Sequence, residues 1–265
     1  MSVIHLFVVA VVQGITEFLP ISSSGHLVLI PAVTGWPDQG LAIDVAVHLG
    51  TLVAVAGYFR ADVGQLALGG IGLLRGRWTP AGRLALLIAA ATVPAVLAGL
   101  ILTALDPAWT RSVALIGWTT LIFGILLWVA DRFGPMTVPM GEFGWRHALL
   151  IGLAQALALL PGTSRSGITM TAARALGYSR IDAAKIAMLL SMPVIIAASA
   201  VTALKVWQTG GIAIGIDAVI AAILAAIAAW LAIGAMMAWL ARASFTPFVL
   251  YRIVLGALLL GWAYG

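Results

Sequence analysis

The chain has 265 residues, of which 63% are hydrophobic and only 9% are charged, and its mean hydropathy is +1.12. Soluble proteins carry a charge on roughly a quarter of their residues, so this composition excludes a soluble globular protein and indicates an integral membrane protein. The chain has no cysteine, which excludes a disulfide framework, an iron–sulfur cluster and a thiolate nucleophile. The net charge of +5 is expected to set membrane topology, and nucleic acid is not an expected partner.

The first apolar region covers residues 3–34 and is broken in the middle by TEFLPISSSGH (16–26). No Lys or Arg precedes it, so we do not expect a removable signal peptide. Each half is shorter than the roughly 20 apolar residues that one crossing needs. Non-helical backbone at membrane depth is tolerated only where protein or a water-filled cavity surrounds it. The region is therefore predicted to be a re-entrant helical hairpin, with a full crossing kinked at Pro20 as the alternative.

Six uninterrupted apolar runs follow, in two groups of three, and each is long enough to cross a bilayer. They cover residues 42–59, 84–104, 111–130, 183–204, 212–240 and 248–264. Between the groups lies a second broken region, 146–176, which is interrupted by LPGTSRSG (160–167). It predicts a second hairpin, or a crossing kinked at Pro161. The predicted fold is an all-α polytopic membrane protein with six transmembrane helices and two re-entrant hairpins.

The two broken regions resemble each other. A shift of 142 positions aligns Gln13 with Gln155, Ser22 with Ser164, Ser24 with Ser166 and Gly25 with Gly167, without a gap. Since three crossings follow each region, a duplication is predicted, and the odd number of crossings requires the second half to be inverted. We therefore expect one membrane domain, 1–265, built from repeat 1 (about 1–135) and repeat 2 (about 142–265).

The cations support an inverted arrangement. If the segment 60–83 is a cytoplasmic loop, eleven cations are cytoplasmic: Arg60, Arg75, Arg77, Arg83, Arg132, Arg146, Arg174, Arg180, Lys185, Arg242 and Arg252. Two are outside: Arg111 and Lys205. This bias follows the positive-inside rule, and it places both termini outside. The remaining cation, Arg165, lies at the tip of the second hairpin.

Arg165 is the strongest candidate for a functional residue. An arginine near the bilayer centre costs between about 2.5 and more than 10 kcal/mol, so it normally faces a polar cavity and has a partner. Its planar guanidinium matches the oxygens of a phosphate or a carboxylate. The structural alternative is an ion pair with Glu17, and the two roles can coexist.

Hydroxyl residues and glycines open the helix after each break: Ser22, Ser24 and Gly25 in the first region, and Ser164, Ser166, Gly167 and Thr169 in the second. Helix N-termini present free N–H groups and the positive end of the dipole, and they bind anions. For any single serine, the alternative is a plain N-cap. Two such tips that meet at one arginine favour an anion site.

Three more polar residues complete the candidate site. Glu17 lies four positions after Gln13, so both side chains share a face if this segment is helical. The carboxylate is suited to act as a general base or as a ligand for a hard divalent cation, and His26 is a candidate acid, base or nucleophile. Asp44 and His48 are four residues apart, and they support this site, have a role at the helix end, or pair with each other. The whole set suits phosphoryl transfer on a lipid phosphate.

The stretches QGITEFLPISSSGH (13–26) and PGTSRSG (161–167) resemble the two signature motifs of the bacterial undecaprenyl-diphosphate phosphatases of the bacitracin-resistance (BacA/UppP) type. The resemblance extends over essentially the whole chain. It implies an inner-membrane enzyme, open to the periplasm, that hydrolyses polyprenyl diphosphate to the monophosphate and phosphate. The carrier lipid would thereby be recycled for peptidoglycan and other envelope polymers.

The resemblance also implies roles for particular residues. The acidic motif of the family falls on Gln13 and Glu17, its Ser-His motif on Ser23 and His26, and its phosphate-binding arginine on Arg165. It implies that Ser164 and Thr169 flank the bound phosphate. It further implies a dependence on Mg²⁺ or Ca²⁺, with Glu17 as the metal ligand. Many members carry Glu where this chain has Gln13, which puts a two-carboxylate metal site in doubt. The nucleophile stays open among Ser23, His26 and water.

The implied partners are the polyprenyl diphosphate substrate, which bacitracin sequesters, and membrane lipids; a homodimer is compatible with the family. Two other functions compete with this one. A transporter or flippase of the carrier lipid would also use inverted repeats and interrupted helices. The type-2 phosphatidic acid phosphatases share the SSSGH and SR elements, but their pattern needs a histidine after SR, and the last histidine of this chain is His147.

Overall fold

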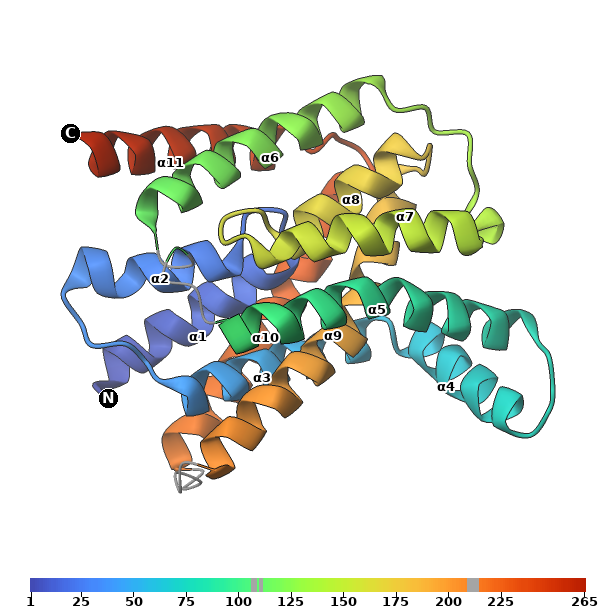
Figure 1. Ribbon diagram of the computed structural model, residues 1–265, viewed down its shortest axis with the longest axis horizontal. Helices are drawn as coiled ribbons and strands as arrows, with labels where there is room; N and C mark the ends of the chain where they lie inside the picture. The colour runs from blue at the N-terminus through green and yellow to red at the C-terminus, as the bar shows by residue number, and fades with distance from the viewer. Residues whose placement is uncertain (106–108, 110–111, 209–214) are drawn as a thin grey trace.

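The computed structural model describes residues 1–105, 109, 112–208 and 215–265, and it is helical throughout (Figure 1). Apart from one isolated bridge between Val138 and Tyr178, the described ranges contain no β-structure. The helices are α1 (Val3–Phe18), α2 (Ser23–Thr34), α3 (Leu41–Tyr58), α4 (Arg60–Leu74), α5 (Pro80–Leu105), α6 (Val113–Phe133), α7 (Trp145–Ala156), α8 (Arg165–Ala175), α9 (Arg180–Gln208), α10 (Ile216–Leu240) and α11 (Thr246–Tyr264), with short 3-10 turns at Met140–Glu142 and Leu157–Leu159.

Six of these helices are long and apolar enough to cross a membrane: α3, α5, α6, α9, α10 and α11. They coincide with the six predicted crossings, although residue 111 and residues 212–214, at the starts of two predicted crossings, lie outside the described residues. The predicted class, an all-α polytopic membrane protein, is confirmed. The boundaries of the two repeats stay a prediction.

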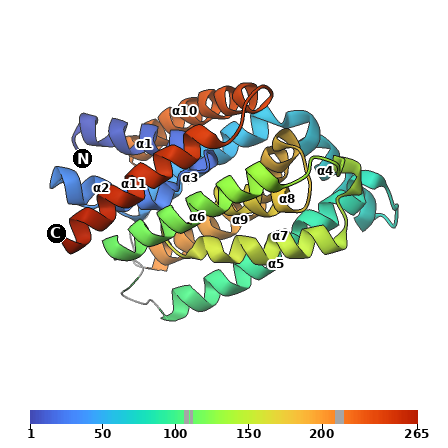
Figure 2. The ribbon, with the colours of Figure 1, turned by 90° about the horizontal axis from the view of Figure 1, so that it is seen from above.

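Both broken regions form hairpins. The helix α1 has 16 residues and α2 has 12, so at 1.5 Å per residue neither reaches the thickness of about 30 Å of a bilayer core. The helices α7 and α8 have 12 and 11 residues. The two arms of each region pack against each other (Figures 1 and 2). A single kinked helix would separate its arms, so the kinked crossing is the wrong alternative for both regions.

The two halves interlock. Helix α1 packs along α10, α7 packs along α5, and α6 packs along α11 (Figure 2). Glycines allow these backbones to approach closely: a Cβ on Gly14 would lie 2.6 Å from the carbonyl oxygen of Ala225, and one on Gly152 would lie 2.5 Å from that of Ala91. The hairpin of each half is therefore held by a long helix of the other half.

The segment 60–83 differs from the prediction. It is not a loop, because residues Arg60–Leu74 form α4, which packs against α5. A Cβ on Gly69 would lie 2.4 Å from the backbone carbon of Ala81, so glycine permits this close packing. The ion pair of Asp62 with Lys185, 2.7 Å long, ties the start of α4 to α9. The charges and glycines of α4 lower its mean hydropathy. The segment therefore lacks the long apolar run by which the sequence predicts a crossing.

Two of the predicted cytoplasmic cations are inside the protein. The side chains of Arg174 and Arg252 are fully buried. Arg174 bonds the carboxylate of Asp131, and Arg252 lies beneath the hairpin tips. Arg252 therefore does not lie at the membrane surface as predicted, because it bonds a carbonyl oxygen in each hairpin tip. The sidedness of the other ten, Arg174 included, stays a prediction, and Arg111 lies outside the described residues.

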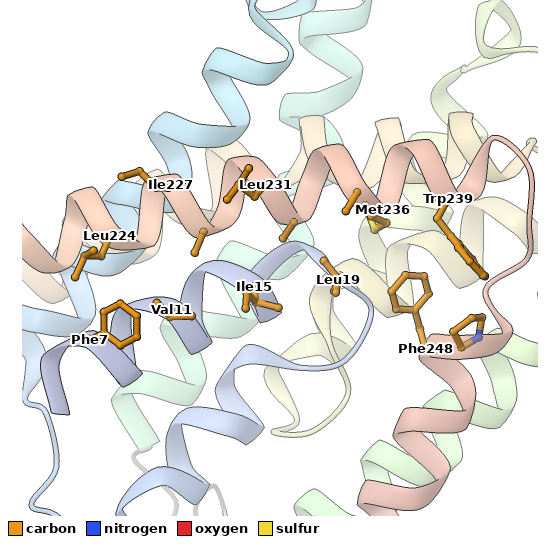
Figure 3. A pocket seen from close by; sticks show the side chains of 14 residues that line it. Phe7, Val11, Ile15, Leu19, Leu224, Ile227, Leu231, Met236, Trp239 and Phe248 are labelled. Carbon is orange, nitrogen blue, oxygen red and sulfur yellow. The ribbon is translucent and has the colours of Figure 1, made fainter. Parts of the chain in front are cut away.

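An apolar groove of about 730 Å³ follows α1 and α10 and ends at the start of α11 (Figure 3). Phe7 and Ile15 of α1 and Leu19, which follows α1, line one side of the groove. Trp239 and Phe248 line the end near the start of α11. The groove lies on the opposite face of α1 from Gln13 and Glu17, because residues 15 and 17 project about 200° apart on a helix. Helix α1 thus separates the apolar groove from the polar side chains of Gln13 and Glu17.

Substitution of Gly162 by alanine is expected to destabilise the second hairpin. The φ angle of Gly162 is +88°, and a Cβ there would lie 2.2 Å from Thr119 Oγ1 and 2.6 Å from the Ile116 carbonyl oxygen. The left-handed backbone and the overlap together should lower the free energy of unfolding by more than about 2 kcal/mol. The thermal midpoint of the detergent-solubilised protein measures this loss.

Gly35 offers a matched control. Its φ is +69°, but a Cβ there meets nothing within 4 Å. Gly35→Ala should therefore lose only the backbone contribution, about 1 kcal/mol. Equal losses for the two variants would contradict the close packing of Gly162.

Candidate active site

The two hairpin tips, residues 19–22 and 160–164, share one local structure. Ser22 and Ser164 have φ angles of 74° and 71°, and they are the non-glycine residues with positive φ in the described part of the chain. The hydroxyl of each accepts a hydrogen bond from a backbone N–H three residues on, that of Gly25 at 3.4 Å and of Gly167 at 3.1 Å. Such strain costs about 1–3 kcal/mol per residue. The same cap in the same strained conformation supports the predicted alignment of the two regions.

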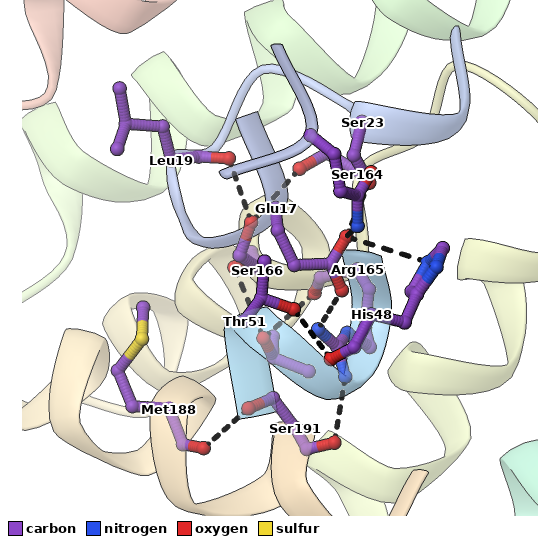
Figure 4. A network of polar contacts seen from close by, with 12 residues as sticks. Glu17, Leu19, Ser23, His48, Thr51, Ser164, Arg165, Ser166, Met188 and Ser191 are labelled. Carbon is purple, nitrogen blue, oxygen red and sulfur yellow. Dashed lines mark hydrogen bonds and ion pairs between the residues drawn. The ribbon is translucent and has the colours of Figure 1, made fainter. Parts of the chain in front are cut away.

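Glu17 is the centre of a polar network between the tips (Figure 4). Its Oε1 accepts a hydrogen bond from Arg165 Nη2 at 2.6 Å. Its Oε2 accepts one from Ser23 Oγ at 2.6 Å and one from Gln13 Nε2 at 2.9 Å. The predicted acid, arginine and serine therefore meet, although they come from α1, α8 and α2.

The tips are also bonded to each other directly. Ser166 Oγ, in the first turn of α8, donates to the carbonyl oxygen of Leu19 at 2.9 Å (Figure 4). Arg165 Nη1 donates to the carbonyl oxygen of Ser191 in α9 at 2.8 Å. The guanidinium is thus held from two sides in one orientation, with only 14% of its side chain exposed.

Several predicted binding residues are engaged locally. Thr169 donates its hydroxyl hydrogen to the carbonyl of Arg165 in its own helix and is 1% exposed. The hydroxyls of Ser22 and Ser164 cap their helices, as the plain N-cap alternative proposed. Ser24, in contrast, is exposed and lines a cavity.

His26 does not join the Glu17 network. Its Nδ1 lies 2.6 Å from the carbonyl oxygen of Ser22, and its Nε2 lies 2.5 Å from the hydroxyl of Tyr251 in α11. Among the described residues, it makes no hydrogen bond to Ser23 or Glu17. Because a carbonyl only accepts, Nδ1 carries the hydrogen, and Nε2 of the neutral ring accepts from Tyr251.

His48 lies closer to the network than His26 does. Its Nε2 is 3.9 Å from Glu17 Oε2, and its Nδ1 is 2.6 Å from the carbonyl oxygen of Asp44. Of the three alternatives, support of the site is the one that the geometry favours for His48, whereas Asp44 lies in the first turn of α3, as a role at the helix end requires. The Asp44 carboxylate accepts instead from Gln39 Nε2 at 2.8 Å.

A cavity of about 650 Å³ is lined by α2, by the start of α3 and by the start of α6, and it includes His48 of the network. The helix α2 lies at the end of the molecule that carries both termini (Figure 1). Ser24, Asp38, Gln39, Asp44 and His48 are its polar lining residues, and among them His48 lies 3.9 Å from Glu17. This cavity gives the polar tips a route to the outside of the protein.

Arg252 was missed as a residue of this region. Its guanidinium donates to the carbonyl oxygens of Pro20 at 3.3 Å and Gly162 at 3.1 Å, one in each tip, and to those of Thr119 and Thr120 in α6. Its position near the start of the last crossing suggested the membrane surface. The available signal was an arginine more than one turn inside an apolar run.

The side chains alone do not build a metal site. In the described part of the chain, no group of three or more His, Cys, Asp or Glu residues could hold a metal ion. Among the described residues, the polar network between the tips contains one carboxylate, that of Glu17. Beside it, Gln13 Oε1 is buried and has no hydrogen-bond partner, so it is a second oxygen that could bind a cation. Magnesium is commonly held by one or two carboxylates with substrate phosphates and waters. These donors therefore fit a cation that arrives with an anionic substrate.

The arrangement suits transfer of a phosphoryl group. A carboxylate that accepts a hydrogen bond from a serine hydroxyl is placed to remove its proton. An arginine and two helix N-termini at the same point stabilise charge on phosphate oxygens.

A family profile described as bacitracin resistance protein BacA matches residues 6–258 of this chain. The chain is 55% identical to an undecaprenyl-diphosphatase of Dinoroseobacter shibae and 54% identical to one of Roseobacter denitrificans, and both alignments cover all of both chains. It is 50% identical to an undecaprenyl-diphosphatase 1 of Rhodospirillum rubrum, over all of this chain and 96% of the relative.

Removal of the Ser166 hydroxyl is expected to loosen the contact between the tips. Ser166→Ala would remove the donor that α8 supplies to the Leu19 carbonyl, which would keep only the N–H of Ile21 at 2.7 Å, and the loss of this bond should cost about 0.5–1.5 kcal/mol in the free energy of unfolding. Ser191→Ala is the matched control, because Ser191 is as buried but donates to Met188 within its own helix. The thermal midpoints in detergent should differ, with the lower value for Ser166→Ala. The opposite order would show that this bond does not hold the tips together.

Proposed function

The chain belongs to the bacitracin resistance protein BacA family, and from this membership and the geometry of its site we propose that it hydrolyses undecaprenyl diphosphate to undecaprenyl phosphate and inorganic phosphate. The observation that carries the proposal is the contact of Ser23, Glu17 and Arg165 between the tips. It supplies a nucleophile, a base and an anion clamp at one point.

In the proposed reaction, Ser23 Oγ attacks the terminal phosphorus and Glu17 Oε2 takes its proton. The bond from phosphorus to the bridging oxygen breaks, and undecaprenyl phosphate leaves. Glu17 passes the proton to the departing phosphate or to solvent and is again ionised. Water then attacks the phosphorus of the phosphoserine while Glu17 takes a proton from the water, the bond from phosphorus to Ser23 Oγ breaks, Glu17 returns the proton to Ser23 Oγ, and inorganic phosphate is released. Ser23 is preferred to His26 as the nucleophile because its hydroxyl lies 2.6 Å from the carboxylate, whereas the imidazole of His26 is bonded to Tyr251.

Arg165 has two tasks in this scheme. Without substrate it balances the charge of Glu17, because a lone carboxylate inside the bilayer would be costly. With substrate bound, its guanidinium would donate hydrogen bonds both to Glu17 and to the oxygens of the terminal phosphate. The free N–H groups at the starts of α2 and α8 add donors to the same oxygens.

The apolar surroundings support a lipid as the substrate. The side chain of Leu19 lines the groove of Figure 3, while its carbonyl accepts from Ser166 in the network of Figure 4. The apolar groove thus begins at the first tip, beside the polar site. A soluble diphosphate would have no use for such a surface.

The proposed location is the bacterial inner membrane, with the cavity facing the periplasm. The predicted bias of cations places both termini outside, and α2, which lines the cavity, lies at their end of the molecule. Recycling of the carrier lipid there would serve synthesis of peptidoglycan. It would also protect the cell from bacitracin, which sequesters the diphosphate. A homodimer stays a prediction.

A flippase of the carrier lipid is the weaker candidate. It would use Arg165 and the helix N-termini to hold the phosphate. It would not need a serine hydroxyl bonded to a carboxylate, and the names of the relatives describe phosphatases.

Substitution of the proposed nucleophile should abolish phosphate release. Ser23→Ala and Glu17→Gln are each expected to lower turnover of undecaprenyl diphosphate by about 100-fold or more, because each removes part of the activated nucleophile. The measurement is inorganic phosphate released by the purified protein in detergent, with undecaprenyl phosphate as the substrate that should not react.

Ser179→Ala is the control for these variants. Ser179 Oγ donates to the carboxylate of Asp182 at 2.7 Å, so the same kind of bond is lost at the start of α9, away from the tips. Its turnover should stay within about twofold of the unmodified protein. A Ser23→Ala protein with normal turnover would exclude the serine mechanism.

We further propose that the divalent cation arrives with the diphosphate, because one carboxylate cannot hold it alone. Without substrate, Mg²⁺ or Ca²⁺ should leave the thermal midpoint of the unmodified protein unchanged. Gln13→Glu places a second carboxylate beside Glu17, so this variant should be stabilised, by about 2.7 kcal/mol when the cation is at 100 times its dissociation constant. An equal shift in both proteins would mean that the unmodified side chains already bind the ion.

A further inference from the structure

The last helices of the two halves, α6 and α11, carry equivalent dipeptides. A shift of 132 positions aligns TTLIFG (119–124) with YRIVLG (251–256), so Thr119 and Thr120 correspond to Tyr251 and Arg252. The glycine that ends each stretch lies where the helices touch. A Cβ on Gly124 would be 2.9 Å from Arg252 Cβ, and one on Gly256 would be 3.0 Å from the Gly117 carbonyl oxygen. The close packing of α6 and α11 brings both dipeptides under the tips.

The dipeptide on α6 holds the second tip. Thr119 donates its hydroxyl hydrogen to the carbonyl of Pro161, and Thr120 donates to the carbonyl of Gly162 at 3.3 Å. Both hydroxyls thus satisfy carbonyls that the break between α7 and α8 leaves without helical partners. The second tip is fixed by a helix of the other half.

The dipeptide on α11 makes the corresponding contacts to the first hairpin. Its longer side chain, Arg252, also contacts the second tip. Arg252 Nη1 donates to the carbonyl of Pro20, while Nη2 donates to that of Gly162. In the 142-position alignment, these two carbonyls are equivalent. Arg252 therefore fastens the same point of both tips with one guanidinium.

Its neighbour Tyr251 contacts the start of α2. The hydroxyl is 2.5 Å from His26 Nε2, and the two rings are nearly parallel, at 11° with centroids 5.7 Å apart. Since Nδ1 of the same ring is bonded to the Ser22 carbonyl, both nitrogens of His26 have fixed partners. Tyr251 thus sets the rotamer and the tautomer of this imidazole.

We infer that Tyr251 and Arg252 are positioning residues for the phosphatase reaction: Arg252 joins the two tips, and Tyr251 orients His26. The inference rests on the proposed function. Neither residue needs to touch the substrate. Arg252 is fully buried, and in the described part of the molecule its guanidinium bonds carbonyl oxygens and no carboxylate. Its charge is therefore stabilised, but not neutralised, by the dipoles of the backbone whose geometry it determines.

The role of Arg252 predicts that a lysine cannot replace it. Lysine keeps the charge but is a single point donor that cannot span the Pro20 and Gly162 carbonyls together. Arg252→Lys is expected to lower kcat for undecaprenyl diphosphate by at least about tenfold, with KM changed by less than about threefold, because misplacement acts on the transition state. Normal kcat for Arg252→Lys, with a raised KM for Arg252→Met, would instead show a role in attracting the anion and would overturn the inference.

Arg174→Lys separates loss of function from loss of folding. Arg174 is equally buried and also donates to several carbonyls, but it lies at the end of α8 away from the tips. Both lysine variants should lower the thermal midpoint in detergent. The folded Arg174→Lys protein should keep kcat within about threefold of the unmodified protein. If kcat fell as much in Arg174→Lys as in Arg252→Lys, in step with the thermal midpoint, Arg252 would have only a structural role and the inference would be wrong.

Tyr251 is tested by a double-mutant cycle with His26. Tyr251→Phe keeps the ring and removes only the hydroxyl, so it should lower kcat about tenfold when His26 is present and by less than about twofold in a His26→Ala background. Tyr264→Phe on the same helix loses a hydrogen bond from Trp118 and should have no effect on kcat. Equal effects of Tyr251→Phe in the two backgrounds, or a normal kcat for His26→Ala, would overturn the role of Tyr251. Phosphate release by the unmodified protein tests the proposed function separately.

Discussion

The ion pair between Glu17 and Arg165 is the constraint on which the rest of the structure depends. Charged groups at membrane depth are costly unless they are paired and hydrogen-bonded. The two residues lie 148 positions apart, on different hairpins, so the pair forms only if the two tips meet. The tips meet because each hairpin packs on a long helix of the other half, where small residues such as Gly14 let the backbones approach. Interlocking of the halves is therefore a condition for burying the charges.

The charges beneath the tips do not balance. Arg165 is paired with Glu17, but the buried Arg252 contacts only carbonyl oxygens in the part of the chain that the structure describes. Backbone dipoles stabilise this second cation without neutralising it. A diphosphate carries several negative charges, so a site with one surplus cation and two helix N-termini gains more from binding it than a neutral site would.

The sequence predicts the parts of this site that lie within short motifs. Breaks in apolar runs predict both hairpins, the spacing of Gln13 and Glu17 predicts their shared face, and the serines after each break predict helix starts. Contacts made by other helices are not predicted. Tyr251 and Arg252 reach the site through packing of α11, which no local pattern records, whereas support of the site by His48 was one of the alternatives that its spacing from Asp44 left open. Helix α4 was missed for the opposite reason, since packing on α5 stabilises a segment whose composition resembles a loop.

The duplication that the sequence predicts would account for the two similar tips, which nevertheless differ in chemistry. Both tips keep the strained serine cap and the free N–H groups of a helix start. Only the first has a hydroxyl bonded to a carboxylate, and only the second has an arginine at the first turn. The supporting helices differ in the same way, with two threonines on α6 and a tyrosine and an arginine on α11. A symmetric pair of anion sites would hold a diphosphate equally at both ends, whereas this asymmetry places the nucleophile on one side and the clamp on the other.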